Sequence, residues 1–275
     1  MTETEPSDRE AGGMRVWKAE TGVFLGVAFV AAGMLGVAQP ATGIPDEVVQ
    51  LTQFGPAVGV AAVALLWPSR IRVRLAGALP ARGAGGSGAA AGWLLLTAPL
   101  IIVLSAGGYA ALRGDAVVTD PRGLAHPFGL VVVAQLVGAC AEELGWRCWF
   151  QPLLRARFGA PAASVLVGVV WGVWHVQVFA QAPAYAAGFL VATVAMSVVL
   201  GLGLERVRAG RLLVAGGFHT LVNLGMLLFM DEESGAVAPM VLFGAACLVA
   251  AVPWVVGAGR RRAPDTIGTA RRSAL

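Results

Sequence analysis

The chain has 275 residues, of which 57% are hydrophobic and only 13% are charged, and its formal net charge is +4. Soluble domains are roughly half apolar and a quarter charged, so the composition excludes an ordinary soluble protein. What remains is an unusually apolar soluble domain or a membrane protein.

Eight apolar segments favour the membrane protein, because a helix of about 20 apolar residues spans the hydrocarbon core. They cover residues 21–39, 49–67, 92–112, 127–150, 160–180, 184–204, 212–230 and 237–257. The second segment is the weakest, since Gln50, Thr52 and Gln53 stand near its start. We therefore predict an all-α, polytopic integral membrane protein with about eight transmembrane helices.

The ends of the chain are polar. Residues 1–20 predict a cytoplasmic tail, residues 21–257 the membrane domain, and residues 258–275 a basic cytoplasmic tail. The first tail is too long and too acidic for a signal peptide, so we interpret the first span as an uncleaved anchor. Residues 79–91 are rich in small residues and predict a linker.

The distribution of positive charge supports eight spans. With the N-terminus placed in the cytoplasm, 17 of the 20 lysines and arginines fall on the cytoplasmic side. Only Arg113 and Arg122 fall outside, and Arg147 lies within the fourth span. Cytoplasmic loops are enriched in such residues, which predicts that both termini are cytoplasmic. The arginines would face anionic lipid headgroups, so the net charge gives no reason to expect nucleic acid as a partner.

Ionisable and strongly polar groups within the spans are few and are concentrated in three of them. Such groups are costly in lipid and usually face a cavity or one another. The candidates in the fourth, fifth and seventh spans are Glu142, Glu143, Arg147, His175, Gln177, His219 and Asn223. Their concentration predicts a central cavity inside the membrane domain.

Helical spacing separates the roles of the two glutamates. Glu143 and Arg147 are four residues apart in the favourable acid-first order, which predicts an ion pair. Glu142 is turned by about 100° from Glu143 and needs another partner. His219 and Asn223 are also four residues apart and can point into one cavity.

A hairpin between the fourth and fifth spans predicts which residues share a depth. Gly159 and Pro161 mark a turn there. Glu142 and His175 are equidistant from a turn centred between Phe158 and Gly159, which would place both at one level of the membrane.

These side chains have the chemistry of amide hydrolysis. A buried glutamate such as Glu142 can take a proton from water. Two histidines can bind a metal or donate to an oxyanion, and the amide of Asn223 can do either. Glu142, His175 and His219 could thus complete a three-ligand zinc site, although the chain has no HExxH motif. The residues alone leave a zinc cofactor and no cofactor both open.

The order of these motifs resembles a known family. Glu142-Glu143-x-x-x-Arg147, Trp171-x-x-x-His175 and His219-x-x-x-Asn223 occur in sequence, each in an apolar helix. They are similar to the motifs EExxxR, FxxxH and HxxxN/D of the CPBP family, which contains the CAAX prenyl proteases type 2 and the bacteriocin-processing Abi proteins. The resemblance covers about residues 140–225, within a core of about 127–230. The usual phenylalanine of the second motif is Trp171 here.

The resemblance implies an intramembrane endopeptidase of the CAAX prenyl protease type 2 kind, a family usually labelled metalloproteases. Glu142 would activate water together with His175, while His219 and Asn223 would stabilise the oxyanion. Glu143 and Arg147 would support them. The expected partners are a peptide or protein substrate and the lipid bilayer of the cell membrane.

Two other classes of function stay open. The buried groups could form the relay of a proton-coupled transporter, although no clear internal repeat is present. The chain could also be a non-catalytic immunity or scaffold protein. The arginine-rich, lysine-poor composition points to a bacterial source, where the substrate need not be prenylated. Substrate and oligomeric state are not predicted.

Overall fold

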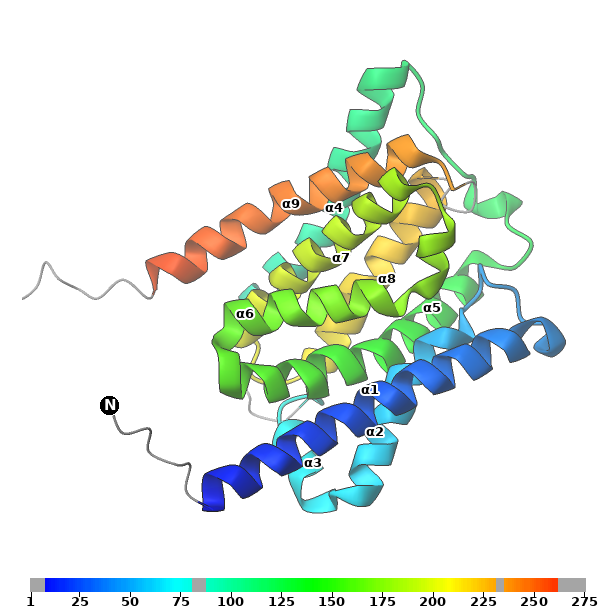
Figure 1. The fold of residues 1–275 in the computed structure, drawn as a ribbon. Coiled ribbons are helices and arrows are strands. Elements are labelled where there is room, and N and C mark those ends of the chain that lie inside the picture. Colours follow the sequence, from blue (N-terminus) through cyan, green and yellow to red (C-terminus); the bar gives the residue numbers. More distant parts are fainter. Residues whose placement is uncertain (1–7, 81–87, 231–234, 262–275) are drawn as a thin grey trace, which may run out of the picture.

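The computed structural model describes residues 8–80, 88–230 and 235–261, and over these ranges the fold is all-α as predicted (Figure 1). The N-terminal part contains α1 (Asp8–Thr42), η1 (Leu51–Phe54), α2 (Gly55–Leu66), α3 (Pro68–Arg74), α4 (Gly88–Arg113) and the short turn η2 (Pro121–Gly123). The C-terminal part contains α5 (Phe128–Glu143), the π-helical η3 (Leu144–Phe150), α6 (Gln151–Trp174), η4 (Val176–Ala180), α7 (Pro183–Gly203), η5 (Leu204–Arg206), α8 (Arg211–Phe229) and α9 (Val237–Arg260).

Six of these helices are long and apolar enough to cross a membrane, so the chain is a multi-pass membrane protein. The number differs from the eight expected segments for two reasons. The fourth and fifth segments join into one stretch, Phe128–Trp174, of 47 residues, and the second is the shorter apolar helix Leu51–Leu66. Large apolar side chains such as Val37 and Leu65 are more than four-fifths exposed, as lipid-facing residues would be.

The helices at the two ends of the chain extend into the segments expected as tails. Helix α1 begins at Asp8, so residues 8–20 are helical, whereas residues 1–7 lie outside the described part. Helix α9 continues to Arg260, and most of the basic tail lies outside the described residues, as do 81–87 of the expected linker. The start of α1 and the end of α9 lie at the same end of the bundle (Figure 1).

The predicted hairpin is present, and Gly159 makes it possible. Its φ of 76° and ψ of 167° interrupt the helical backbone, in a region that side chains with a Cβ rarely adopt. Pro161 follows in the first turn of the second arm. A backbone N–H has no intrahelical partner at that position, so proline loses no hydrogen bond there. Helix α6 then returns beside η3 and packs on α7.

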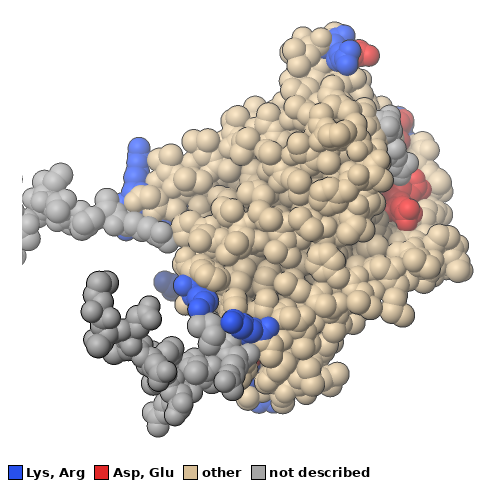
Figure 2. All heavy atoms as spheres, in the orientation of Figure 1, with Lys and Arg blue, Asp and Glu red and all other residues tan. Residues whose placement is uncertain are grey.

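Basic and acidic side chains gather at different ends of the molecule. On the face drawn in Figure 2, most of the basic residues gather at the end where α9 finishes, and the acidic residues lie toward the opposite end. A broad band without charge separates them (Figure 2). This arrangement is typical of a bundle whose middle lies in lipid.

Two arginines expected to face lipid headgroups have a protein partner instead. Arg70 and Arg74 of α3 donate to the fully buried carboxylate of Glu20 on α1, over 3.1 and 2.5 Å. The guanidinium of Arg74 also lies over the ring of Trp149. The cluster ties α1 and α3 to η3, although Arg70 remains nearly half exposed.

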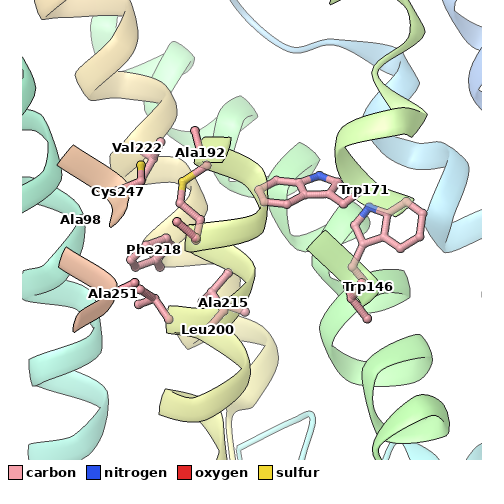
Figure 3. Close-up of a cluster of buried hydrophobic side chains, with 14 of the residues drawn as sticks. Ala98, Trp146, Trp171, Ala192, Leu200, Ala215, Phe218, Val222, Cys247 and Ala251 are labelled. Carbon is pink, nitrogen blue, oxygen red and sulfur yellow. The ribbon is translucent and has the colours of Figure 1, made fainter. Parts of the chain in front are cut away.

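One buried apolar cluster extends through the bundle, and part of it fills the space between α4, α7, α8 and α9. Figure 3 shows the large side chains of Leu200 and Phe218 among small ones such as Ala192 and Ala215. Small residues between large ones let the helices approach closely. Such close contact matters in lipid, because van der Waals packing rather than the hydrophobic effect drives helix association there. Trp171 belongs to the same buried cluster and lies on the right of the view (Figure 3), and its indole N–H donates to Glu142.

Helix α2 and η1 pack directly on α5 and η3, and glycines make the contact possible. A Cβ on Gly145 would lie 2.4 Å from the Cβ of Pro56 and 3.0 Å from its backbone. A Cβ on Gly138 would lie 2.4 Å from Oε1 of Gln53. The N-terminal helices are therefore seated against the segment that carries the two glutamates.

We expect Gly145→Ala to destabilise the protein by about 1–3 kcal/mol, because the added methyl group must displace the Pro56 backbone. The matched control is Gly107→Ala in α4, where a Cβ would meet nothing within 4 Å and a helix interior favours alanine. Thermal unfolding in detergent would compare them. Equal midpoints for the two variants would contradict the packing argument.

Candidate active site

Glu143 is the centre of a buried charged network. Its Oε2 lies 3.0 Å from Nε of Arg147, as the four-residue spacing predicts, and both side chains are fully buried. Its Oε1 lies 2.9 Å from Nδ1 of His219 on α8. Since a carboxylate only accepts, Nδ1 of His219 carries the proton. Glu143 thus joins two helices and leaves Nε2 of His219 for another partner.

Arg147 lies inside a π-helical turn, a feature often found at functional sites. Its Nη1 donates to Oγ of Ser197 on α7 over 3.0 Å, and that hydroxyl donates to the carbonyl of Ser164 on α6 over 2.6 Å. Its guanidinium lies over the indole of Trp171, 4.8 Å from the ring centroid. The arginine therefore links η3, α6 and α7, and its second Nη has no partner among the described residues.

Glu142 has a different partner from Glu143, as its angular offset predicts. The indole Nε1 of Trp171 donates to Oε1 of Glu142 across the hairpin. The Glu142 side chain is 1% exposed, and no described residue donates to its second oxygen. One oxygen is thus fixed by the indole, while the other keeps its capacity to accept a proton.

His175 stands where α6 ends. Its Nδ1 is 2.9 Å from the carbonyl of Trp171, four residues earlier in the chain. A carbonyl only accepts, so Nδ1 carries the proton and Nε2 of the neutral ring carries the lone pair. The rings of Trp171, Trp174 and Phe189 surround the imidazole edge-on, with ring centroids 4.9–5.9 Å away.

The hairpin places Trp171, one helical turn before His175, opposite Glu142. The equal depth of Glu142 and His175 stays a prediction, because the contact across the hairpin is made by the long indole of Trp171. His175 and His219 both lie edge-on to the ring of Trp171, whose N–H donates to Glu142.

Asn223 lies on α8 one turn beyond His219, and its Nδ2 donates to Oε1 of Gln135 on α5 over 3.0 Å. Gln135 is buried and in turn donates to the backbone carbonyl of Glu47 over 3.1 Å. The fifth-span residue Gln177 lies in η4 and has no role in these contacts.

The predicted zinc ligands do not form a metal site in this arrangement. Within residues 8–80, 88–230 and 235–261, no three His, Cys, Asp or Glu side chains are grouped closely enough to hold a metal ion. Nδ1 of His219 is held by Glu143, a contact that metal-binding histidines also make through their second ring nitrogen, so it leaves Nε2 available. As placed, Glu142, His175 and His219 are not grouped closely enough for a three-ligand zinc centre, and no step below passes through a metal.

Four of the residues that complete these contacts were not predicted from the sequence. They are Gln135, Ser164, Ser197 and the indole N–H of Trp171 as a donor. Gln135 offered a signal, since it is a polar residue in an apolar segment on the same helical face as Glu142, seven residues later. The serines offered none, because small hydroxyl residues are common in membrane helices.

Comparison with known proteins adds an independent finding. Residues 124–225 match the family model described as type II CAAX prenyl endopeptidase Rce1-like. The chain is 28% identical over 125 residues to the CAAX prenyl protease 2 of Methanococcus maripaludis, a match that covers 41% of this chain and 46% of the relative. It is 22% identical over 163 residues to the lysostaphin resistance protein A of Staphylococcus aureus strain MRSA252, covering 59% of this chain and 39% of the relative.

The chain thus spans less than half the length of these relatives. The matched segment contains every predicted site residue, namely Glu142, Glu143, Arg147, His175, His219 and Asn223. The resemblance to the type II CAAX prenyl endopeptidases is therefore confirmed for the part of the chain that carries the buried charged network.

Proposed function

We propose that the protein is an intramembrane endopeptidase that hydrolyses a peptide bond with a water molecule activated by Glu142. One observation carries the proposal above the others. Glu142 is a buried carboxylate held at one oxygen by Trp171 and unengaged by described residues at the other, and the ring of Trp171 also contacts His175 and His219. The match of residues 124–225 to a protease family supports it.

Glu142 and His175 have separate tasks in activating the water molecule. The free oxygen of Glu142 takes a proton from water as the water oxygen attacks the peptide carbonyl carbon. Nε2 of His175 carries a lone pair because its Nδ1–H is bound to the helix end, so it can accept the second O–H and orient the water. Glu142 then returns its proton to the leaving nitrogen as the C–N bond breaks.

His219 and Asn223 serve the oxyanion. Glu143 holds Nδ1–H of His219, so the opposite nitrogen, when protonated, is a fixed donor. Asn223 lies one turn further along α8 and contributes an amide N–H. Arg147 balances the charge of Glu143, and its guanidinium lies over the Trp171 ring. Glu143 therefore supports the site, while Glu142 acts on the water.

The proposed setting is the cell membrane, with both termini cytoplasmic. The basic residues gathered at the end of the bundle where α9 finishes support that orientation. The substrate is a peptide or protein at the membrane. The names of the relatives suggest a prenylated C-terminal peptide as the first probe to try.

The test compares protein termini in membranes from cells that express the wild type or Glu142→Gln at equal levels. We expect new N- and C-termini by mass spectrometry only with the wild type. A farnesylated CAAX peptide added to purified protein forms a second arm, which decides whether the prenyl group is needed. Identical termini in the two membrane samples across several growth conditions would overturn the proposal.

Trp171→Phe should lower the turnover number by up to about a hundredfold with little change in KM. Phenylalanine keeps the ring beneath Arg147 and beside the histidines but removes the N–H that holds Glu142. Trp149→Phe is the matched control, because its buried N–H has no described partner and its ring packs on Phe24 and Phe150. Equal turnover in the two variants would show that the indole N–H does not position Glu142.

A further inference from the structure

A chain of amide contacts leads from the N-terminal helices into the proposed site. The carbonyl of Glu47, in the loop between α1 and η1, accepts from Nε2 of Gln135 over 3.1 Å. Oε1 of Gln135 accepts from Nδ2 of Asn223 over 3.0 Å. Gln135 is 8% exposed and belongs to none of the three motifs.

The backbone carbonyl at the start fixes the direction of every bond in this chain. A carbonyl oxygen can only accept, so the Gln135 atom beside it must be the amide nitrogen. The other end of Gln135 is then an oxygen, which requires the nitrogen of Asn223 to face it. Asn223 is thereby held in one of its two amide orientations, with Oδ1 and the second N–H directed away from Gln135.

The loop that supplies the carbonyl is itself firmly placed. Gln39 of α1 donates to the carbonyl of Val49 over 2.9 Å and accepts from the N–H of Leu51 over 2.8 Å. The side chain of Val49 is buried, and its Cγ2 would lie 2.8 Å from a Cβ on Gly138, one turn after Gln135 on α5. The carbonyl of Glu47 thus sits on a fixed support rather than on a loose end.

We propose that Gln135 is a positioning residue that sets the orientation of the Asn223 carboxamide, with the loop of residues 43–50 as its anchor. The inference rests on the proposed function, in which Asn223 donates to the oxyanion. It gives the loop of residues 43–50, which lies outside the matched residues 124–225, a part in the reaction. Without the anchor, the Asn223 amide could turn over and present oxygen to the oxyanion.

Gln135→Met tests the proposal, because methionine keeps the length and volume but removes both amide contacts. We expect the turnover number to fall about tenfold with KM nearly unchanged. Gln53→Met is the matched control, since Gln53 is also a buried glutamine against α5 and its Oε1 has no described partner. Its turnover should equal that of the wild type.

A double-mutant cycle with Asn223→Ala separates positioning from a general structural effect. If Gln135 acts through Asn223, the double variant should be no slower than Asn223→Ala alone, which we expect to be about a hundredfold slower than the wild type. Rates that multiply, or an unimpaired Gln135→Met, would overturn the positioning role while leaving the proposed function standing. Full activity of Asn223→Ala would instead remove Asn223 from the mechanism, and the inference with it.

Discussion

Replacing Glu142 by glutamine is expected to lower hydrolysis by about a thousandfold and to leave the fold unchanged. The substitution removes the group that takes the proton from water, and general-base catalysis accounts for about 10²–10⁴ in rate. The glutamine oxygen can still accept from the Trp171 indole, so the contact across the hairpin persists. The rate would be measured on purified protein with the peptide identified from the terminus comparison.

Glu20→Gln is the control for that experiment. Glu20 is also a fully buried carboxylate, but it pairs with Arg70 and Arg74 away from the network around Glu143. We expect this variant to lose stability and keep the wild-type turnover per folded molecule. A Glu142→Gln enzyme that still hydrolyses its peptide at more than a tenth of the wild-type rate would remove Glu142 from the role of base.

The largest loss of stability is expected from Glu143→Gln. The change removes the only carboxylate that contacts Arg147 among the described residues, and it leaves a guanidinium in the interior. Breaking a buried ion pair by removing one partner costs about 3–5 kcal/mol. Activity should fall as well, because a neutral amide oxygen holds the Nδ1–H of His219 less strongly than a carboxylate does. Thermal unfolding in detergent and turnover per folded molecule would measure the two effects.

A second variant shows whether the loss comes from the unpaired charge. Glu143→Leu combined with Arg147→Met removes both charges, and such replacements are often neutral or stabilising. We expect the double variant to recover much of the stability lost by Glu143→Gln and to remain inactive. A Glu143→Gln protein as stable as the wild type but devoid of activity would mean that the two glutamates have exchanged roles.

The helical fold and one pair in the site followed from local patterns. Apolar runs predicted the helices because lipid demands them, and the pairing of Glu143 with Arg147 followed from a four-residue spacing on one helix. The angular offset between adjacent residues predicted that Glu142 needs another partner, and Trp171 is that partner. These are features in which a single helix contains the needed information.

What could not be predicted depends on how the helices are set against one another. The pairing of His219 with Glu143 requires the rotation and the axial position of α8 relative to α5. The amide contacts of Gln135 require a loop 88 residues earlier in the chain. The contact of the Trp171 indole with Glu142 depends on a π-helical turn and a reversal whose geometry no periodicity in the sequence reveals.

Gly159 determines the direction in which every later helix crosses the membrane. A straight helix of 47 residues would be about 70 Å long, more than twice the thickness of the hydrocarbon core. Counted as one crossing, this stretch would make α8 parallel to α5. The contacts of Glu143 with His219 and of Gln135 with Asn223 require the two helices to be antiparallel. Whether this stretch crosses the membrane once or twice, and hence the direction of each later helix, therefore depends on one glycine with a positive φ.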